Sequence, residues 1–459
     1  MTVIDAADSA ALATMSPREV DRMLAQAVTA QQVWRTVEVA ERARLLRNLA
    51  QVLRDRAEAY GELITREMGK PITEAVAEVR KCALACDYYA KHGPAVLADR
   101  DVVTSARRSY VAQEPMGVVL AVMPWNFPFW QVIRFAAPAL LAGNAGIVKH
   151  AANVSRSMLA IEEAFLAAGF PPHLLRALII DESVVANVVD GLLADPRTAA
   201  VTLTGSNRAG AAVAAAAGRS TKKAVLELGG SDPFIVLADA DIAAIAGPDG
   251  PAVRSRFLNG GQSCLAAKRF IVEDSVADEF AERLTRSVAA LRVGDPMDPD
   301  TQIGPMARPD LVDGVERQVT ESVALGARIL TGAVRGRVDG VEGEYFLPTV
   351  LTDVTADMPV FTEETFGPVA AVIRARDADH AVELADTTEY GLGASIWTAD
   401  EARALRLGSR LTSGALFVNA VVASDPRMPF GGTRSSGYGR ELASDGLLEF
   451  TNTRTIWVG

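Results

Sequence analysis

The alternation of short apolar runs with helical patterns is the feature that most constrains how this chain can fold. Runs that predict strands lie at 109–112, 117–123, 146–149, 200–204 and 224–228, and helical patterns occur at 129–141, 155–168 and 209–217. Strands that are apolar along their length and separated by helices are typical of a parallel sheet with helices on both faces. We therefore expect an α/β fold.

Other patterns along the chain indicate further parts. A capping box with proline at the first helical position, Ser16-Pro17-Arg18-Glu19, predicts the start of a helical region over 20–89. The strand rhythm restarts at 234–237 and 269–272, which indicates a second α/β domain. A last short strand, 453–458, is suited to pairing with another strand. The length of 459 residues supports two or three domains.

The charge balance excludes several classes of partner. A net charge of −11 argues against a nucleic-acid or anionic-membrane surface, because both select basic patches. No apolar run is long enough to span a bilayer, and Met1–Thr14 lacks the basic and apolar regions of a signal peptide. We expect a cytoplasmic protein, in which a small anionic substrate would need a locally positive pocket.

The cysteines and histidines do not form a recognisable metal site. The three cysteines, Cys82, Cys86 and Cys264, cannot make a disulfide framework and fit a reducing compartment. Cys82 and Cys86 are four residues apart in a helical pattern with only His92 nearby, so we interpret them as packing residues. The four histidines show no ligand spacing, so we expect no metal and disfavour a metal hydrolase.

Cys264 is the candidate nucleophile. It ends the segment Asn259-Gly260-Gly261-Gln262-Ser263-Cys264, whose glycines permit close approach of the backbone to a ligand. A reactive thiolate must be reachable and gains from nearby backbone N–H groups. The alternative interpretation, a buried structural cysteine, is the commoner one for a cysteine taken alone.

Two further residues suggest the rest of a catalytic site. Glu227 ends an apolar strand, where a carboxylate is costly to bury and a raised pKa would suit a general base. Its alternative is a glutamate that emerges into solvent. Asn126 lies in the turn Pro124-Trp125-Asn126-Phe127-Pro128, where its amide can donate to a developing oxyanion, or can serve the turn alone.

These segments resemble the aldehyde dehydrogenase superfamily, from the N-terminal helices to the last strand. The matching patterns occur in family order: Pro124-Trp125-Asn126-Phe127-Pro128, Glu227-Leu228-Gly229-Gly230, Gly261-Gln262-Ser263-Cys264, Glu364-Thr365-Phe366-Gly367-Pro368 and Pro429-Phe430-Gly431-Gly432. The resemblance implies that the chain has three parts: a Rossmann-like NAD(P)-binding domain (1–103 and 117–227), an α/β catalytic domain (228–420) and a small β oligomerisation element (104–116 and 438–459). It also implies assembly into a homodimer or homotetramer.

The resemblance also implies a mechanism. Cys264 attacks the aldehyde carbonyl, and the Asn126 amide and the Cys264 backbone N–H hold the resulting thiohemiacetal. Hydride transfer to the nicotinamide leaves a thioester, and Glu227 activates the water that releases the acid. In physical terms this is covalent catalysis with an oxyanion site and a general base.

The cofactor is expected to bind without the usual phosphate turn. No G-x-G-x-x-G pattern is present, but Gly205-Ser206 follows a strand and opens a helix whose N-terminus offers free N–H groups to a pyrophosphate. The resemblance places Trp125 and Lys149 near the adenosine ribose, and Glu364 on the nicotinamide ribose with Phe366 in the same motif. A solvated strand end is the alternative for Lys149, and a loop charge for Glu364.

The choice between NADP and NAD depends on the residues after Lys149. NAD-preferring relatives often carry a glutamate three residues later, and here that residue is Ala152. A 2′-phosphate would not be repelled, and Ser155, Arg156 or Arg208 could assist it. We expect NADP to be preferred, with NAD possible.

Arg134 gives the clue to the substrate. It interrupts an apolar helix, where a guanidinium needs a carboxylate partner from either the substrate or the protein. The sequence resembles the bacterial succinate-semialdehyde dehydrogenase branch, in which an arginine matching Arg134 and a serine matching Ser424 bind the substrate carboxylate. The branch commonly carries a second arginine soon after the nucleophile, and none occurs here before Lys268, so we expect carboxylate binding to be weaker or differently built. The matches at Arg134 and Ser424 nevertheless favour this branch. Succinate semialdehyde is therefore the expected substrate, with another small aldehyde or semialdehyde as the alternative.

Two other interpretations compete with this one. A CoA-acylating dehydrogenase on the same fold typically lacks the glutamate, so Glu227 favours hydrolysis. A non-catalytic protein that kept the fold is disfavoured because Cys264, Glu227 and Asn126 are all present.

Overall fold

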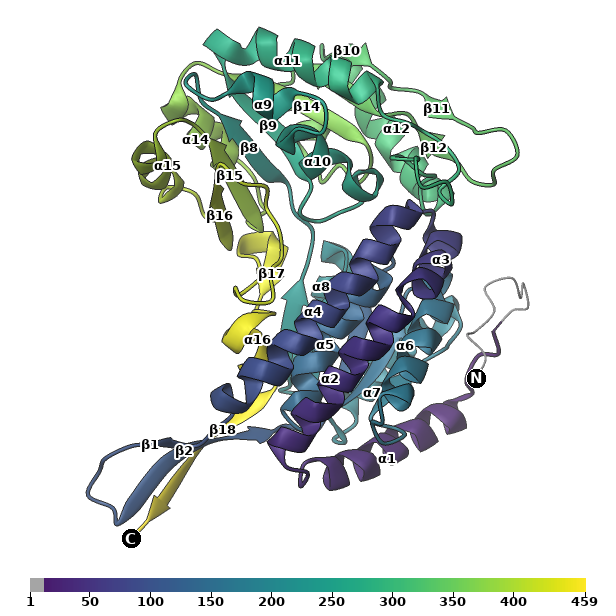
Figure 1. The fold of residues 1–459 in the computed structure, drawn as a ribbon, viewed down its shortest axis with the longest axis vertical. Helices are drawn as coiled ribbons and strands as arrows, with labels where there is room; N and C mark the ends of the chain where they lie inside the picture. The colour runs from purple at the N-terminus through teal and green to yellow at the C-terminus, as the bar shows by residue number, and fades with distance from the viewer. Residues whose placement is uncertain (1–11) are drawn as a thin grey trace.

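The computed structural model describes residues 12–459, and part of the N-terminal stretch in which we found no signal peptide lies outside them. Two α/β units are stacked along the long axis of the molecule, and a β arm that carries the C-terminus projects from the lower unit (Figure 1). Each unit has its own sheet and hydrophobic core. Within the described residues, no helix is long and apolar enough to cross a membrane.

The helices follow the predicted order. Their bounds are α1 (Pro17–Trp34), α2 (Val39–Asp55), α3 (Ala57–Met68), α4 (Ile72–Val96), α5 (Pro128–Leu141), α6 (Ser155–Ala167), α7 (Val185–Ala194), α8 (Asn207–Arg219), α9 (Ile242–Ala246), α10 (Pro251–Phe257), α11 (Asp274–Ala289), α12 (Pro309–Ala324), α13 (Pro359–Thr362), α14 (Ala378–Asp386), α15 (Glu401–Gly408) and α16 (Ala443–Leu448). The capping box predicted at Ser16 and Glu19 is formed. Cys82 and Cys86 are buried on α4, as expected of packing residues.

The first sheet has the order β17-β7-β6-β3-β4-β5. Its strands are β3 (Val118–Met123), β4 (Ala145–His150), β5 (Leu175–Ala177), β6 (Thr198–Thr204), β7 (Lys223–Glu227) and β17 (Gly437–Tyr438), and all are parallel except β17. The chain runs outward from β3 through β4 to β5, then returns to place β6 on the other side of β3. Open α/β sheets bind ligands at such a switch point, outside the carboxyl ends of the strands.

The second sheet has the order β10-β13-β14-β9-β8-β15-β16. Its strands are β8 (Asp232–Val236), β9 (Ala267–Glu273), β10 (Arg328–Thr331), β13 (Thr349–Thr352), β14 (Val369–Ala375), β15 (Gly393–Trp397) and β16 (Ala415–Val418), and only β10 is antiparallel to its neighbour. Cys264 precedes β9, and Glu227 ends β7 of the first sheet. The candidate residues therefore lie where the carboxyl ends of the first sheet meet the amino ends of the second.

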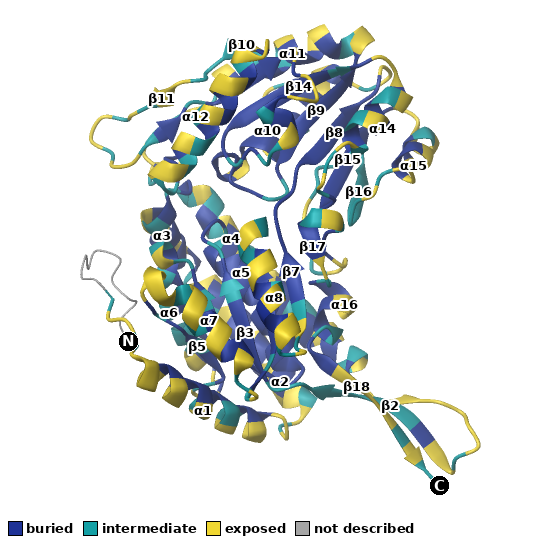
Figure 2. Ribbon diagram, turned by 180° about the vertical axis from the view of Figure 1, so that it is seen from behind, coloured by how far each residue is buried: buried dark blue, intermediate teal, exposed yellow. Residues whose placement is uncertain are grey.

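The arm is a three-stranded sheet of β1 (Arg100–Asp101), β2 (Arg108–Pro115) and β18 (Thr451–Val458). The last strand pairs with β2 along its whole length, from Thr451 opposite Pro115 to Val458 opposite Arg108. The arm is mostly exposed or half-buried (Figure 2), and Trp457 is 56% exposed. A separate two-stranded ribbon joins β11 (Arg335–Gly336) and β12 (Tyr345–Phe346).

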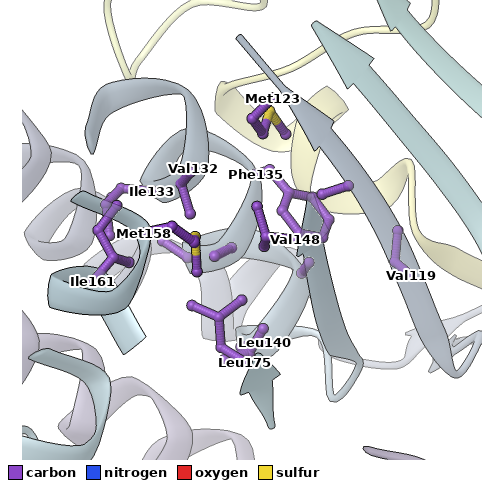
Figure 3. Packing of buried hydrophobic residues seen from close by; sticks show 14 of the residues in the cluster. Val119, Met123, Val132, Ile133, Phe135, Leu140, Val148, Met158, Ile161 and Leu175 are labelled. Atoms are coloured by element: carbon purple, nitrogen blue, oxygen red, sulfur yellow. The ribbon is translucent and has the colours of Figure 1, made fainter. Parts of the chain in front are cut away.

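Helix α5 is the centre of the first core. All of its residues are buried, and Val132, Ile133 and Phe135 pack among side chains of β3, β4 and α6 (Figure 3). Asn144 follows this helix and joins three segments of backbone. Its Oδ1 accepts from the N–H groups of Met116 and Gly117 at 2.8 and 3.0 Å, and its Nδ2 donates to the carbonyls of Ala139 and Phe450 at 3.1 and 2.9 Å.

We predict that Asn144→Ala lowers the stability of the fold by about 3 kcal/mol, because it leaves buried backbone donors and acceptors without partners. Asn187→Ala, on the exposed face of α7, is the matched control and should change stability little. Thermal and urea unfolding followed by circular dichroism measure both variants. Equal stability of Asn144→Ala and wild type would show that water replaces these contacts without cost.

Candidate active site

Two cavities meet at Cys264. The larger, of about 410 Å³, is also lined by Lys81, Arg134 and Ser424. The smaller, of about 260 Å³, is also lined by the cofactor and oxyanion candidates Trp125, Asn126, Gly205, Ser206, Glu364 and Phe366. The structure therefore places the nucleophile between a compartment with cationic side chains and a compartment at the switch point of the first sheet.

The loop before Cys264 is folded by backbone conformation. Asn259, Gly260 and Gly261 have successive φ values of 55°, 61° and 74°, a left-handed run that glycine tolerates best. A Cβ at Gly261 would lie 2.3 Å from the carbonyl oxygen of Gly367, so only glycine fits there. The glycines therefore allow the backbone of this loop to approach the backbone at Gly367, rather than a ligand. This approach brings the loop against the Glu364–Pro368 segment.

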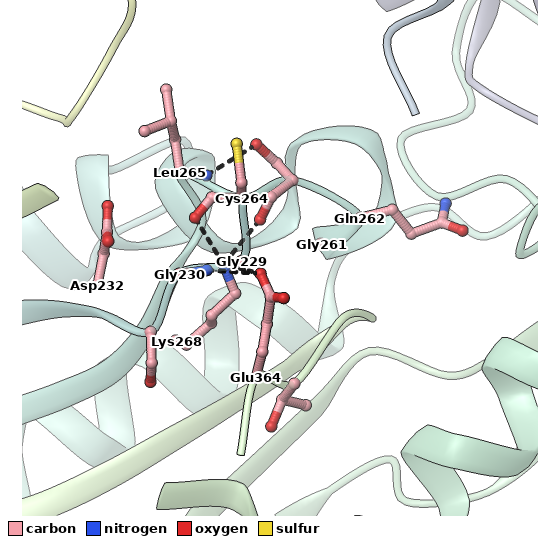
Figure 4. A network of polar contacts seen from close by, with 12 residues as sticks. Gly229, Gly230, Asp232, Gly261, Gln262, Cys264, Leu265, Lys268 and Glu364 are labelled. Atoms are coloured by element: carbon pink, nitrogen blue, oxygen red, sulfur yellow. Dashed lines mark hydrogen bonds and ion pairs between the residues drawn. The ribbon is translucent and has the colours of Figure 1, made fainter. Parts of the chain in front are cut away.

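Lys268 holds the nucleophile from below (Figure 4). Its Nζ donates to the carbonyl oxygens of Ser263 and Cys264, both at 2.8 Å, and lies 3.4 Å from the carboxylate of Glu364. Burial raises the pKa of the Cys264 thiol to about 11, while the charges of Lys268 and Arg134 oppose that rise. Cys264 is partly exposed and lines both cavities, which is not the position of a buried structural cysteine.

Asn126 is held in place on several sides. Its Nδ2 donates to the Gln262 carbonyl at 3.1 Å, and its Oδ1 accepts from Gln131 Nε2 at 3.0 Å. Its backbone carbonyl accepts from Lys70 and Asn259, both at 2.8 Å. An amide nitrogen carries two N–H groups, so the second N–H of Asn126 remains for the oxygen atom of a substrate bound to Cys264. The geometry is that of an oriented donor rather than of a turn residue alone.

Glu227 is buried at 2% exposure, so the alternative of a carboxylate emerging into solvent is wrong. Neither of its carboxylate oxygens has a hydrogen-bond partner in the described part of the chain. Burial and the nearby Glu441 carboxylate raise the pKa of Glu227 well above its usual range. Glu227 does not line either of the two cavities.

Arg134 is paired with a protein carboxylate and also lines the larger cavity. Its Nε forms an ion pair with Glu441, and one terminal nitrogen donates to Thr204 Oγ1 at 3.3 Å. Its guanidinium also lies over the Phe430 ring, 4.8 Å from the centroid, and lines the larger cavity with Ser424. The protein-carboxylate interpretation is therefore correct, and the position in the cavity expected for substrate contact is also observed.

The remaining cofactor candidates lie in different places. Ala152 and Ser155 line a third cavity of about 670 Å³, with Arg156 beside them. In that cavity the carboxylate of Glu67 accepts from the N–H groups of Arg156 and Ser157 at 2.8 and 3.0 Å, so the first turn of α6 already has a protein anion. Lys149 lines none of these cavities, and burial lowers its pKa.

The smaller cavity brings together several of the predicted cofactor residues. Ser206 caps α8 by accepting from Ala209 N–H, and with Gly205 it lines the wall beneath the helix N-terminus. Trp125 and Phe366 meet edge to face with centroids 5.8 Å apart. Glu364 accepts from Gly230 N–H at 3.0 Å, which orients its carboxylate. A flat ring near Cys264 would find both an apolar wall and polar groups here.

Sequence reasoning missed two charged residues of the site. Lys81 on α4 lines the larger cavity and donates to Ser424 Oγ at 2.7 Å. Glu441 is the partner of Arg134 and the neighbour of Glu227. A search for the carboxylate that Arg134 requires could have pointed to Glu441, but nothing in the spacing links residue 81 to residue 424. Within residues 12–459 no cluster of three or more His, Cys, Asp or Glu is placed to hold a metal.

Comparison with known proteins decides the family. The sequence model of the aldehyde dehydrogenase family matches residues 1–456. The chain belongs to the aldehyde dehydrogenase family. The family resemblance, the α/β fold and the assignment as an NAD(P)-dependent aldehyde dehydrogenase are thereby confirmed.

Similar proteins come from several bacteria. The chain is 48% identical over 424 residues to the succinate semialdehyde dehydrogenase Sad of Escherichia coli K12, named for NAD(P)+, covering 92% of this chain and 90% of the relative. It is 46% identical over 445 residues to succinate-semialdehyde dehydrogenase 1 of Mycobacterium ulcerans, named for NADP(+), covering 96% and 95%. A crystal structure of succinic semialdehyde dehydrogenase from Streptococcus pyogenes with NADP+ superposes with a TM-score of 0.91 at 35% identity, covering 98% and 97%.

We predict that the reactivity of Cys264 toward iodoacetamide rises steeply with pH. Because its thiol has a raised pKa, the thiolate fraction increases about tenfold per pH unit between pH 7 and 10. Lys268→Met should slow alkylation at a given pH by about tenfold, since it removes a charge that favours the thiolate. Mass spectrometry of the labelled protein measures both rates.

Cys264→Ala is the control and should take up no label, because Cys82 and Cys86 are fully buried. A labelling rate that levels off below pH 8 would contradict the prediction.

Proposed function

We propose that this enzyme oxidises succinate semialdehyde to succinate, with NADP as the preferred cofactor. The observation that carries the proposal is the larger cavity, which connects Cys264 to Lys81, Arg134 and Arg254. None of the described residues that line it is a carboxylate, although the chain has a net charge of −11. A cavity that is lined by both the nucleophile and cationic side chains suits a small aldehyde with a carboxylate at its far end.

The relatives support this substrate and cofactor. The similar proteins from Escherichia coli and Mycobacterium ulcerans are named as succinate-semialdehyde dehydrogenases that use NAD(P)+ and NADP(+). Arg134 and Ser424, the two residues expected to bind the substrate carboxylate, line the same cavity as Cys264. Other small aldehydes or semialdehydes remain outcomes of the test below.

The residues of the chain then have the following roles. The Cys264 thiolate adds to the aldehyde carbon, a C–S bond forms, and the carbonyl electron pair moves to oxygen, where the Asn126 amide and the Cys264 N–H donate to it. The bound cofactor supplies a hydride acceptor, and loss of the hydride leaves an acyl group on sulfur. Glu227 takes a proton from water, the hydroxide adds to the acyl carbon, and the C–S bond breaks to return the thiolate.

Glu227 must move to perform this step. In the structure it lies beside Glu441, and neither carboxylate lines the cavities. We infer that its side chain turns toward Cys264 once the acyl group has formed. Its raised pKa means that it must also lose a proton before it can act as a base.

The dinucleotide would be held at the two sites that the cofactor candidates form. The nicotinamide end would lie in the smaller cavity beside Cys264, which is lined by Trp125, Gly205, Ser206, Glu364 and Phe366. The other end would lie in the third cavity near α6, which is lined by Ala152 and Ser155. We place Lys149 at the ribose between them. Because Glu67 already occupies the first N–H groups of α6, we expect a 2′-phosphate to depend on side chains rather than on that helix N-terminus.

The remaining proposals concern organisation. We propose that the NAD(P)-binding domain comprises 1–103 and 117–227, the catalytic domain 228–420, and the oligomerisation element 104–116 and 438–459. The exposed arm, with Trp457 at its surface, supports assembly into a homodimer or homotetramer. We also propose a cytoplasmic location and no nucleic-acid or membrane partner, since the chain is acidic.

A substrate comparison tests the function. We expect kcat/KM for succinate semialdehyde to exceed that for butanal, which has the same chain length without the carboxylate, by about 100-fold, because charge-assisted hydrogen bonds to the carboxylate are lost. NADPH formation at 340 nm without CoA is the measurement, and Cys264→Ala should abolish it. Equal values for the two aldehydes would overturn the substrate, and a requirement for CoA would overturn hydrolysis.

The cofactor preference can be tested at Ala152. We predict that Ala152→Glu lowers kcat/KM with NADP by about 100-fold and changes the value with NAD far less, because a carboxylate repels the 2′-phosphate. Ala152→Gln, which has the same size without the charge, is the matched control. A wild-type enzyme that strongly prefers NAD would show that the absence of a carboxylate at this position does not set the preference.

A further inference from the structure

The larger cavity is lined by a half-buried lysine, Lys81, for which the family patterns gave no role. Lys81 lies on α4, and its ammonium donates to Ser424 Oγ at 2.7 Å. It also lies over the Trp130 ring, 4.2 Å from the centroid, which favours a cation at this place. Both contacts hold the side chain toward the cavity that reaches Cys264.

Arg134 and Lys81 differ in whether a protein carboxylate neutralises their charge. Arg134 forms an ion pair with the buried carboxylate of Glu441. In the described part of the chain, Lys81 forms no ion pair, and the nearby Asp425 is itself paired with Arg427 at 2.6 Å. Arg254, which also lines the larger cavity, is exposed, so Lys81 is the half-buried cation of this cavity that has no ion pair among the described residues.

A half-buried ammonium with no ion pair among the described residues favours an anionic ligand in the cavity. Desolvation and repulsion from Arg134 lower the pKa of Lys81 to about 8. A carboxylate placed in the cavity would restore the charge balance and favour the ammonium form. Ser424 is arranged for the same ligand, because its oxygen accepts from Lys81 and its own O–H is free to donate.

We propose that Lys81 and Ser424 together bind the far carboxylate of the substrate, with Lys81 as the cation that determines specificity. This inference rests on the proposed function, since it assumes a substrate with a carboxylate. Arg134 then has a second task, because its pairing with Glu441 holds one wall of the cavity and the carboxylate beside Glu227.

The test compares Lys81→Met and Lys81→Arg with wild type on succinate semialdehyde and butanal. We expect Lys81→Met to raise KM for succinate semialdehyde and lower its kcat/KM by about 30-fold, with a loss under about threefold for butanal. Lys81→Arg should recover at least part of the lost preference. Inhibition by succinate, which presents the same carboxylate, should weaken in Lys81→Met to a similar extent.

Lys91→Met is the matched control, because Lys91 is exposed on the same helix and lines no cavity of the site. Thermal unfolding of each variant shows whether it is folded. Equal losses on the two aldehydes, or an unchanged preference in folded Lys81→Met, would overturn the role of Lys81. A wild-type enzyme that does not prefer the semialdehyde would instead overturn the proposed function, so the two failures are distinguishable.

Discussion

The backbone carbonyl of Asn126 is the junction on which the active site depends. It accepts from Lys70, which precedes α4, and from Asn259, in the loop that leads to Cys264. Lys70 in turn pairs with Glu78, whose carboxylate accepts from the first free N–H groups of α5 at 2.8 and 3.0 Å. One buried polar network thus joins the N-terminal helices, the oxyanion donor and the nucleophile loop. Such a network is rigid only when every member is satisfied.

Local patterns predicted the elements of the fold, and tertiary contacts determined the site. The strand expected at 117–123 is β3 at Val118–Met123, and the helix expected at 129–141 is α5 at Pro128–Leu141, because both patterns depend on neighbouring residues. The partner of Lys81 is 343 residues away in the sequence, and no periodicity can express that contact. The second arginine of the branch is absent after Cys264, and a second cation that lines the larger cavity, Lys81, comes from α4.

The buried groups around Glu227 form one electrostatic unit. Burial and the Glu441 carboxylate raise the pKa of Glu227, and burial raises the pKa of Glu441 while the charge of Arg134 opposes that rise. Removing the Arg134 guanidinium would therefore alter the surroundings of Glu227, the proposed base, as well as the wall of the larger cavity. A kinetic effect of Arg134 substitutions cannot be assigned to substrate binding alone, which is why Lys81 is the better position at which to test specificity.

The same reasoning explains how an acidic protein could select an anion. The net charge of −11 repels an anionic semialdehyde, but salt screens that repulsion at distances beyond about 10 Å. Inside the cavity, where water is partly excluded, a single ammonium acts much more strongly than the distant surface charges. Because Arg134 is paired with Glu441 and Arg254 is exposed, we attribute the attraction for an anion within the cavity to Lys81. An aldehyde whose carboxylate reaches Lys81 while its carbonyl reaches Cys264 is selected by its length as well as by its charge.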